Sequence, residues 1–309
     1  MTSSPLPLAL QAHQSNQLDE AEMLYRAVLQ AEPQHADAMS LLALVLGGQG
    51  KHDEAITLAQ QACAADPQSA LFAFHLGTVL TTAQKLSDGV AAFQRCISLK
   101  PDMPQAHYNM ANALRAMDRW PEAITAYRTA IRLMPHYAEA YNNLALSLVH
   151  EKQFDDALTA AKKSLEIAPN YGDGWRTVCN IAEQTKDYHL ACEAGVKCTT
   201  LMPESHFSWF GYGVALCRLN RYDEAITAYK RALELKPDRA DIWDNLGQTY
   251  QSMMRLDEAE SIFRKTLEVA GQIIKEEDTR EVDESEYGNR HWHLALMALL
   301  RAKSTQGFA

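Results

Sequence analysis

Apolar and small side chains recur along the chain with helical spacing, and the whole arrangement returns every 34 residues. Proline marks each period at residues 33, 67, 101, 135, 169, 203 and 237. A small residue stands twelve positions before each proline: Ala21, Ala55, Gly89, Ala123, Ala157, Ala191 and Ala225. One further step reaches Ala259, where Gly271 replaces the proline. The pattern predicts eight repeats, starting at residues 2, 36, 70, 104, 138, 172, 206 and 240.

Each repeat contains two helical faces when its residues are numbered from 1 to 34. Positions 4, 7, 8 and 11 fall on one face, and positions 20, 24 and 27 fall on another. Small residues at positions 8 and 20 let two helices approach closely, and a bulky residue at position 24 fills the space beside them. Proline at position 32 cannot continue a helix, so it ends the second one. We therefore expect two packed helices in every repeat.

The last repeat shows the pattern most fully, as Trp243-x2-Leu246-Gly247-x2-Tyr250-x8-Ala259-x3-Phe263. It resembles the tetratricopeptide repeat (TPR), and the resemblance covers residues 2 to about 270. The resemblance implies an all-α fold, a right-handed α-α superhelical solenoid of eight 34-residue helix-turn-helix repeats with a C-terminal capping helix. The array is most similar to the TPR region of O-linked N-acetylglucosamine transferase-like bacterial proteins.

Three segments follow from this pattern: an eight-repeat array over residues 2–275, an acidic linker over 276–288 and a capping helix over 289–304. Residues 276–286 hold seven carboxylates and one arginine, which is typical of a solvated linker. The apolar residues after them favour a helix that covers the last repeat.

Repeat 6 departs most from the pattern. Gly172 and Gly174 open it, Cys179 stands at position 8, and Gly195 replaces the bulky residue of position 24. We expect a local soft point or bend there.

The amino-acid composition limits the classes of partner that this chain is expected to bind. Twenty-nine basic against 39 acidic residues give a net charge of −10, which disfavours nucleic acid and anionic membranes as partners. The sequence contains no uninterrupted apolar run of about 18 residues, so it predicts no membrane span. The six cysteines form no C-x-x-C pair, and the chain has no phosphate-binding loop and no hydrolase or metalloprotease motif. We expect no enzyme activity, no cofactor, no metal and a cytoplasmic location.

The resemblance implies that the first helix of each repeat lines a concave groove, through positions 2, 5, 6, 9, 12 and 13. Asparagine is frequent there, and its amide both donates and accepts, so it can capture any peptide backbone. The candidate peptide-binding residues are Tyr108, Asn109, Asn112, Arg115, Asn142, Asn143, Arg176, Asn180, Asn245 and Gln248. The alternative is that these are solvated surface residues without a ligand.

A second candidate surface is apolar. It consists of Leu41, Leu44, Leu71 and Phe74 in repeats 2 and 3. Either the N-terminal segment folds over it, or it docks a partner's amphipathic helix or a second copy of the chain.

The leading hypothesis is a protein-interaction scaffold that binds an extended peptide or partner helix in this groove. Six groove acids against three bases favour a neutral to basic protein ligand. A first alternative is the substrate-recruiting region of a glycosyltransferase-type enzyme whose catalytic domain is absent from this chain. It depends on Asn109, Asn143 and Asn245, which stand at position 6 as in the transferase repeats, although Thr177 and Gly211 interrupt the series. It also depends on the apolar tail from Trp292 to Phe308, which is similar to the junction that leads into the catalytic domain in bacterial repeat proteins. A second alternative is a self-assembling protein.

Overall fold

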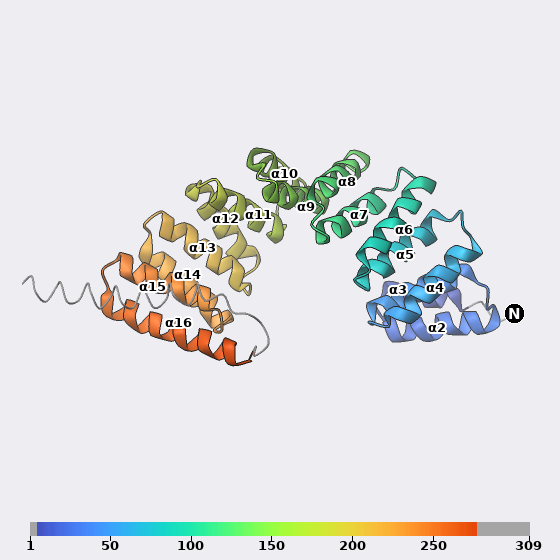
Figure 1. Ribbon diagram of the computed structural model, residues 1–309, viewed down its shortest axis with the longest axis horizontal. Coiled ribbons are helices and arrows are strands. Elements are labelled where there is room, and N and C mark those ends of the chain that lie inside the picture. The colour runs from blue at the N-terminus through green and yellow to red at the C-terminus, as the bar shows by residue number, and fades with distance from the viewer. Residues whose placement is uncertain (1–4, 277–309) are drawn as a thin grey trace, which may run out of the picture. The chain divides into compact units, whose positions relative to one another are not determined.

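The computed structural model describes residues 5–276, in which it places sixteen α-helices and no strand (Figure 1). The prediction of an all-α repeat array is confirmed. The helices are α1 Leu6–Gln14, α2 Leu18–Ala31, α3 Ala36–Gly48, α4 His52–Ala65, α5 Ala70–Thr82, α6 Leu86–Leu99, α7 Pro104–Ala116, α8 Trp120–Leu133, α9 Ala138–His150, α10 Phe154–Ile167, α11 Gly172–Gln184, α12 Tyr188–Leu201, α13 His206–Arg218, α14 Tyr222–Leu235, α15 Ala240–Ser252 and α16 Leu256–Glu276.

The chain divides into two compact parts, an N-terminal half over residues 1–167 and a C-terminal half over 168–309. The first contains α1–α10 and the second contains α11–α16. The predicted linker after Glu276 and the predicted capping helix over 289–304 lie outside the described residues. None of the described helices is both long and apolar enough to cross a membrane.

The two helices of each repeat are joined by a turn that needs one residue with a left-handed backbone. This residue stands at position 15 every time: Asn16, Gly50, Gln84, Asp118, Lys152, Lys186, Asn220 and Met254, with φ between 56° and 79°. In repeat 2, the Lys51 N–H donates to the Leu46 carbonyl at 2.9 Å and the Gly50 N–H donates to the Gly47 carbonyl at 3.1 Å. These two bonds end α3 in the usual Schellman arrangement.

Replacing Gly50 with alanine should lower the free energy of unfolding by about 1 kcal/mol, because an L side chain is disfavoured in the left-handed region. A Cβ at Gly50 (φ 79°) would meet no atom within 4 Å, so the loss would come from the backbone alone. The matched control is Gly48→Ala inside α3, where a Cβ would only touch Leu18 at 3.9 Å. Urea unfolding should show a loss for Gly50→Ala and none for the control; equal stabilities would contradict the turn geometry.

The core of a repeat forms where an aromatic ring lies against a small residue of the paired helix. A Cβ added to Gly77 would lie 2.6 Å from the Phe93 ring, and one added to Gly213 would lie 2.7 Å from the Tyr229 ring. Phe93 and Tyr229 are fully buried, as are the other position-24 aromatics Tyr25, Tyr127 and Phe263. The predicted pairing of a small residue at position 8 with a bulky one at position 24 is therefore confirmed in these repeats.

Repeat 6 fills its core from the next repeat. Gly195 of α12 leaves the position-24 space open, and the side chain of Tyr212 from α13 occupies it. A Cβ on Gly195 would lie 2.7 Å from Tyr212 Cδ2 and 3.1 Å from Tyr212 Cα. The helices α11 and α12 keep 13 and 14 residues, like their counterparts, so the glycines do not interrupt them. The soft point stays a prediction.

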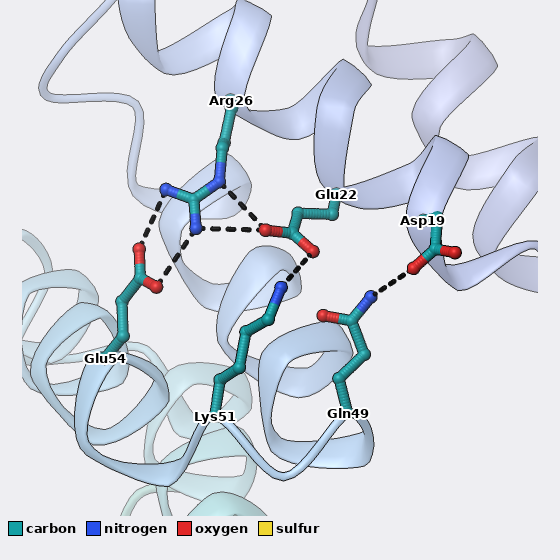
Figure 2. Close-up of polar contacts among 6 residues, drawn as sticks. All are labelled: Asp19, Glu22, Arg26, Gln49, Lys51 and Glu54. Carbon is teal, nitrogen blue, oxygen red and sulfur yellow. Dashed lines mark hydrogen bonds and ion pairs between the residues drawn. The ribbon is translucent and has the colours of Figure 1, made fainter.

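A charged network links the first two repeats at their surface (Figure 2). Arg26 of α2 bridges Glu22 at 3.0 Å and Glu54 of α4 at 2.8 Å, and Lys51 reaches Glu22 at 2.7 Å. The hydrogen bond from Lys51 lowers the pKa of Glu22, and the Arg26 guanidinium acts in the same direction. Exposed ion pairs stabilise a fold only slightly, so this network adds little to the packing of the first two repeats.

Candidate functional site

A hydrogen-bond network joins three of the predicted groove residues to Tyr127 of α8. Asn112 Oδ1 accepts from the Tyr127 hydroxyl at 2.6 Å and from Asn143 Nδ2 at 3.0 Å. Asn143 Nδ2 also donates to the Tyr108 hydroxyl at 3.1 Å. Burial raises the pKa of Tyr127 to about 12, so its hydroxyl stays neutral. The amides of Asn112 and Asn143 therefore connect repeats 4 and 5 to each other.

Other predicted residues on α7 and α9 keep polar atoms that the fold does not use. Asn109 is half-buried, and the described structure shows no hydrogen bond from its side chain. Arg115 Nε and Asn142 Oδ1 are buried atoms without a hydrogen-bond partner among the described residues. Buried polar atoms are paired in most proteins, so unpaired ones on the predicted binding face are candidate ligand contacts.

The predicted apolar surface is mostly part of the core. Leu41 and Leu44 are half-buried against the core of repeats 1–3, and Phe74 packs beside Phe93 with ring centres 5.8 Å apart. Leu71 is the exception, with 48% of its surface exposed. The open apolar area therefore centres on Leu71.

A buried polar pair lies on the same helices. Ser40 of α3 is 1% exposed, and its hydroxyl lies 2.7 Å from Nδ1 of His75 in α5. The pKa of His75 is lowered to about 4; burial is the largest cause, the charge of His13 acts in the same direction, and Asp37 opposes both. His75 is therefore neutral at pH 7.

This pair predicts a pH dependence of stability. The pKa of His75 is about 4 in the folded chain and 6.5 for an ordinary histidine, so the unfolded chain takes up a proton first as the pH falls from 6.5 to 4. Going from pH 7.5 to 5.5 should therefore cost about 1 kcal/mol of unfolding free energy through this group. Urea unfolding at both pH values should show a smaller decrease for His75→Gln than for the wild type. Equal decreases would contradict the assignment.

Two predicted residues of the C-terminal half use their amides locally. Asn245 Nδ2 donates to the Asp241 carbonyl at 2.8 Å within α15, and Gln248 Nε2 donates to Asp244 Oδ2 at 2.8 Å. Each of these two amides therefore already donates a hydrogen bond within α15.

The other two predicted residues, Arg176 and Asn180 of α11, line a cavity of about 360 Å³. We name it the repeat-6 cavity. Glu183 of α11 and Phe207 and Phe210 of α13 lie in its wall, with Ser208, Cys179, Cys198 and Gly211. Arg176 is ion-paired with Asp173 at 2.7 Å, and Asn180 is exposed.

The candidate set did not include the residues that give this cavity its chemistry. Glu183, Phe207 and Phe210 stand at groove positions 12, 2 and 5 of their repeats, so the periodic numbering does place them on the groove. Ser208 stands at position 3, which lies outside the groove positions, and nothing in the sequence distinguishes it. Among the described residues, no cluster of His, Cys, Asp or Glu could hold a metal ion.

Several protein-family models match this chain. Tetratricopeptide-repeat models match residues 6–70, 102–170 and 239–278, and a further TPR-repeat model matches 213–253. A model described as anaphase-promoting complex, cyclosome, subunit 3 matches residues 49–130. Together with the repeated helix pairs, these matches identify the chain as a tetratricopeptide-repeat protein.

Solved structures of low sequence identity have a similar fold. The APC/C hetero-tetramer Cut9–Hcn1 matches with a TM-score of 0.60 and 17% identity; the match covers 91% of this chain, which spans about half (52%) of that one. Pseudomonas aeruginosa PilF matches with a TM-score of 0.59 and 18% identity over 66% of this chain and 93% of its own. YrrB, described as a TPR protein with an unusual peptide-binding site, matches with a TM-score of 0.53 and 22% identity over 58% of this chain and 93% of its own. No curated relative matches. At these identities the likeness shows the fold alone.

Proposed function

We propose that this chain is a non-catalytic scaffold that binds an extended polypeptide, or a partner helix, along the first helices of its repeats. The observation that supports this most directly is the set of unused polar atoms on α7 and α9. Arg115 Nε and Asn142 Oδ1 are buried without partners, and Asn109 makes no hydrogen bond through its side chain within the described structure. A peptide backbone offers a donor and an acceptor at almost every residue, so it can pair with all three side chains.

The fold supports the same role. Helix pairs that pack only on their neighbours leave one helix of each pair available along an extended surface. One similar structure, YrrB, is described as a TPR protein with a peptide-binding site. The peptide ligand proposed here depends on the side chains of this chain, since that likeness is limited to the fold.

The proposal is tested by selecting binders from a random peptide library and measuring their affinity for three variants. Asn109→Ala should weaken binding about three- to tenfold, the value of one or two hydrogen bonds, without changing the thermal midpoint. Asn143→Ala should lower the midpoint, because it removes donors from the network between repeats 4 and 5. Gln61→Ala, an exposed amide on the second helix α4, is the matched control and should change neither quantity. Equal affinities for Asn109→Ala and Gln61→Ala would contradict binding on the first helices.

The glycosyltransferase-type alternative loses its main support. It depended on the asparagines of position 6, but Asn143 donates to Tyr108 and Asn112, and Asn245 donates to the Asp241 carbonyl of its own helix. Asn109 is therefore the one position-6 asparagine whose amide makes no hydrogen bond in the described structure. One unbonded amide does not form a repeated series of asparagines along the array. The interaction scaffold therefore remains the function we propose.

A further inference from the structure

The repeat-6 cavity contains two polar atoms that lack partners. Glu183 Oε1 and Ser208 Oγ are both buried and make no hydrogen bond in the described structure. Ser208 as a whole is 3% exposed, and it is one of the residues that line the cavity. Leaving a buried polar atom without a hydrogen bond is energetically unfavourable. Both oxygens can accept a hydrogen bond, and an ionised carboxylate can do nothing else. A group with several N–H bonds could therefore donate to both of them.

The rest of the wall is apolar. Phe207, Phe210, Cys179 and Cys198 line the cavity together with Glu183 and Ser208. Phe207 is 50% exposed, so its ring is accessible from solvent. Such a wall suits an aliphatic stem. The Phe207 ring already contacts a cation, because the Arg239 guanidinium lies 5.1 Å from its centre. A volume of about 360 Å³ lies at the small end of ligand pockets, which matches one side chain better than a large ligand.

The charges around the cavity agree with a cationic guest. Arg176 is occupied by Asp173 at 2.7 Å. Burial raises the pKa of Glu183, while Arg218 opposes this without forming an ion pair with it in the described structure. Residues 168–276 contain 16 acids and 13 bases, a net charge of −3. A carboxylate that is desolvated and unpaired favours a positive partner and repels a negative one.

We propose that the repeat-6 cavity binds a lysine or arginine side chain of the polypeptide held by the scaffold. The cationic head would donate to Glu183 Oε1 and Ser208 Oγ, and its stem would lie on Phe207 and Phe210. This inference depends on the proposed scaffold function and deepens it by naming the residue class that one position of the ligand must carry. The cavity is lined by residues of repeats 6 and 7, and Gly211 of repeat 7 adds no side chain to its wall.

The test uses four capped pentapeptides, acetyl-Gly-Gly-X-Gly-Gly-amide, with lysine, arginine, norleucine or glutamate at X. Each is titrated into the full chain while NMR follows the amides of Glu183, Ser208 and Gly211. We expect saturable shifts with lysine or arginine, and an affinity at least about tenfold weaker with norleucine, which keeps the stem and lacks the charge. Equal affinity for norleucine or glutamate would overturn the proposal.

Two variants test the cavity and one serves as a control. Glu183→Gln should weaken lysine binding about tenfold, whereas Glu193→Gln, the same change at an exposed site of α12, should leave it unchanged. Gly211→Leu should abolish binding by filling the cavity; a Cβ there would lie 3.6 Å from Cys179 Sγ, an ordinary contact, so the fold should tolerate it. Lysine binding that survives Gly211→Leu overturns the proposal. If library peptides still bind through Asn109 in that case, the scaffold function stands and only the basic pocket fails.

Discussion

Replacing Phe93 with alanine should lower the free energy of unfolding by about 3–5 kcal/mol, among the largest effects expected of a single substitution in the described part of the chain. Phe93 is completely buried in α6, and its ring lies where a Cβ on Gly77 would clash at 2.6 Å. Removing the ring leaves a cavity that the paired helix cannot close, since Gly77 has no side chain to move into it. Phe74 would lose the ring that it packs against at 5.8 Å.

Urea unfolding followed by circular dichroism measures this loss. The control is Met23→Ala in α2, whose side chain is 63% exposed and should cost less than about 0.5 kcal/mol. Because stability in a repeat array is a sum over repeats and their interfaces, amide exchange should accelerate most in α5 and α6. A loss below about 1 kcal/mol would mean that Phe93 is not the core residue described above.

Much of this fold could be predicted from sequence because its information is periodic. Proline and small residues return every 34 positions, and the structure places helices in the same period. The left-handed turn residue at position 15 was not predicted, because only Gly50 of the eight is a glycine. Asparagine, aspartate, lysine, glutamine and methionine occupy the other turns, so no single residue type predicts the left-handed conformation there.

The candidate site was harder to predict than the fold because each polar side chain has several hydrogen-bond partners within reach, and the repeat pattern does not specify which one it takes. Asn109 and Asn143 stand at the same position of consecutive repeats, yet only Asn143 meets a tyrosine and an asparagine of the preceding repeat. The repeat-6 cavity depends on a missing side chain in the neighbouring repeat, since Gly211 lines it. Helical periodicity assigns a face to each residue, but it does not show which partner across an interface a side chain reaches.

Alanine substitutions at two glycines of the C-terminal half should change the free energy of unfolding in opposite directions. Gly195 and Gly211 both lie inside helices, α12 and α13, where alanine is normally favoured by about 1 kcal/mol. At Gly195 an added Cβ would lie 2.7 Å from Tyr212 Cδ2, 3.0 Å from its Cβ and 3.1 Å from its Cα, so the backbone of α13 itself would have to move. Overpacking of this kind outweighs helix propensity, and Gly195→Ala should lower the free energy of unfolding by about 2 kcal/mol.

Gly211→Ala is the matched control and should have the opposite sign. Its Cβ would lie 3.6 Å from Cys179 Sγ, so alanine should raise the free energy of unfolding by up to about 1 kcal/mol. Urea unfolding of the two variants therefore measures the closeness of α12 to α13. The repeat pattern alone predicts a gain for Gly195→Ala, since other repeats carry Ala59 or Ala161 at position 24. A gain at both positions would show that Tyr212 does not fill the space left by Gly195.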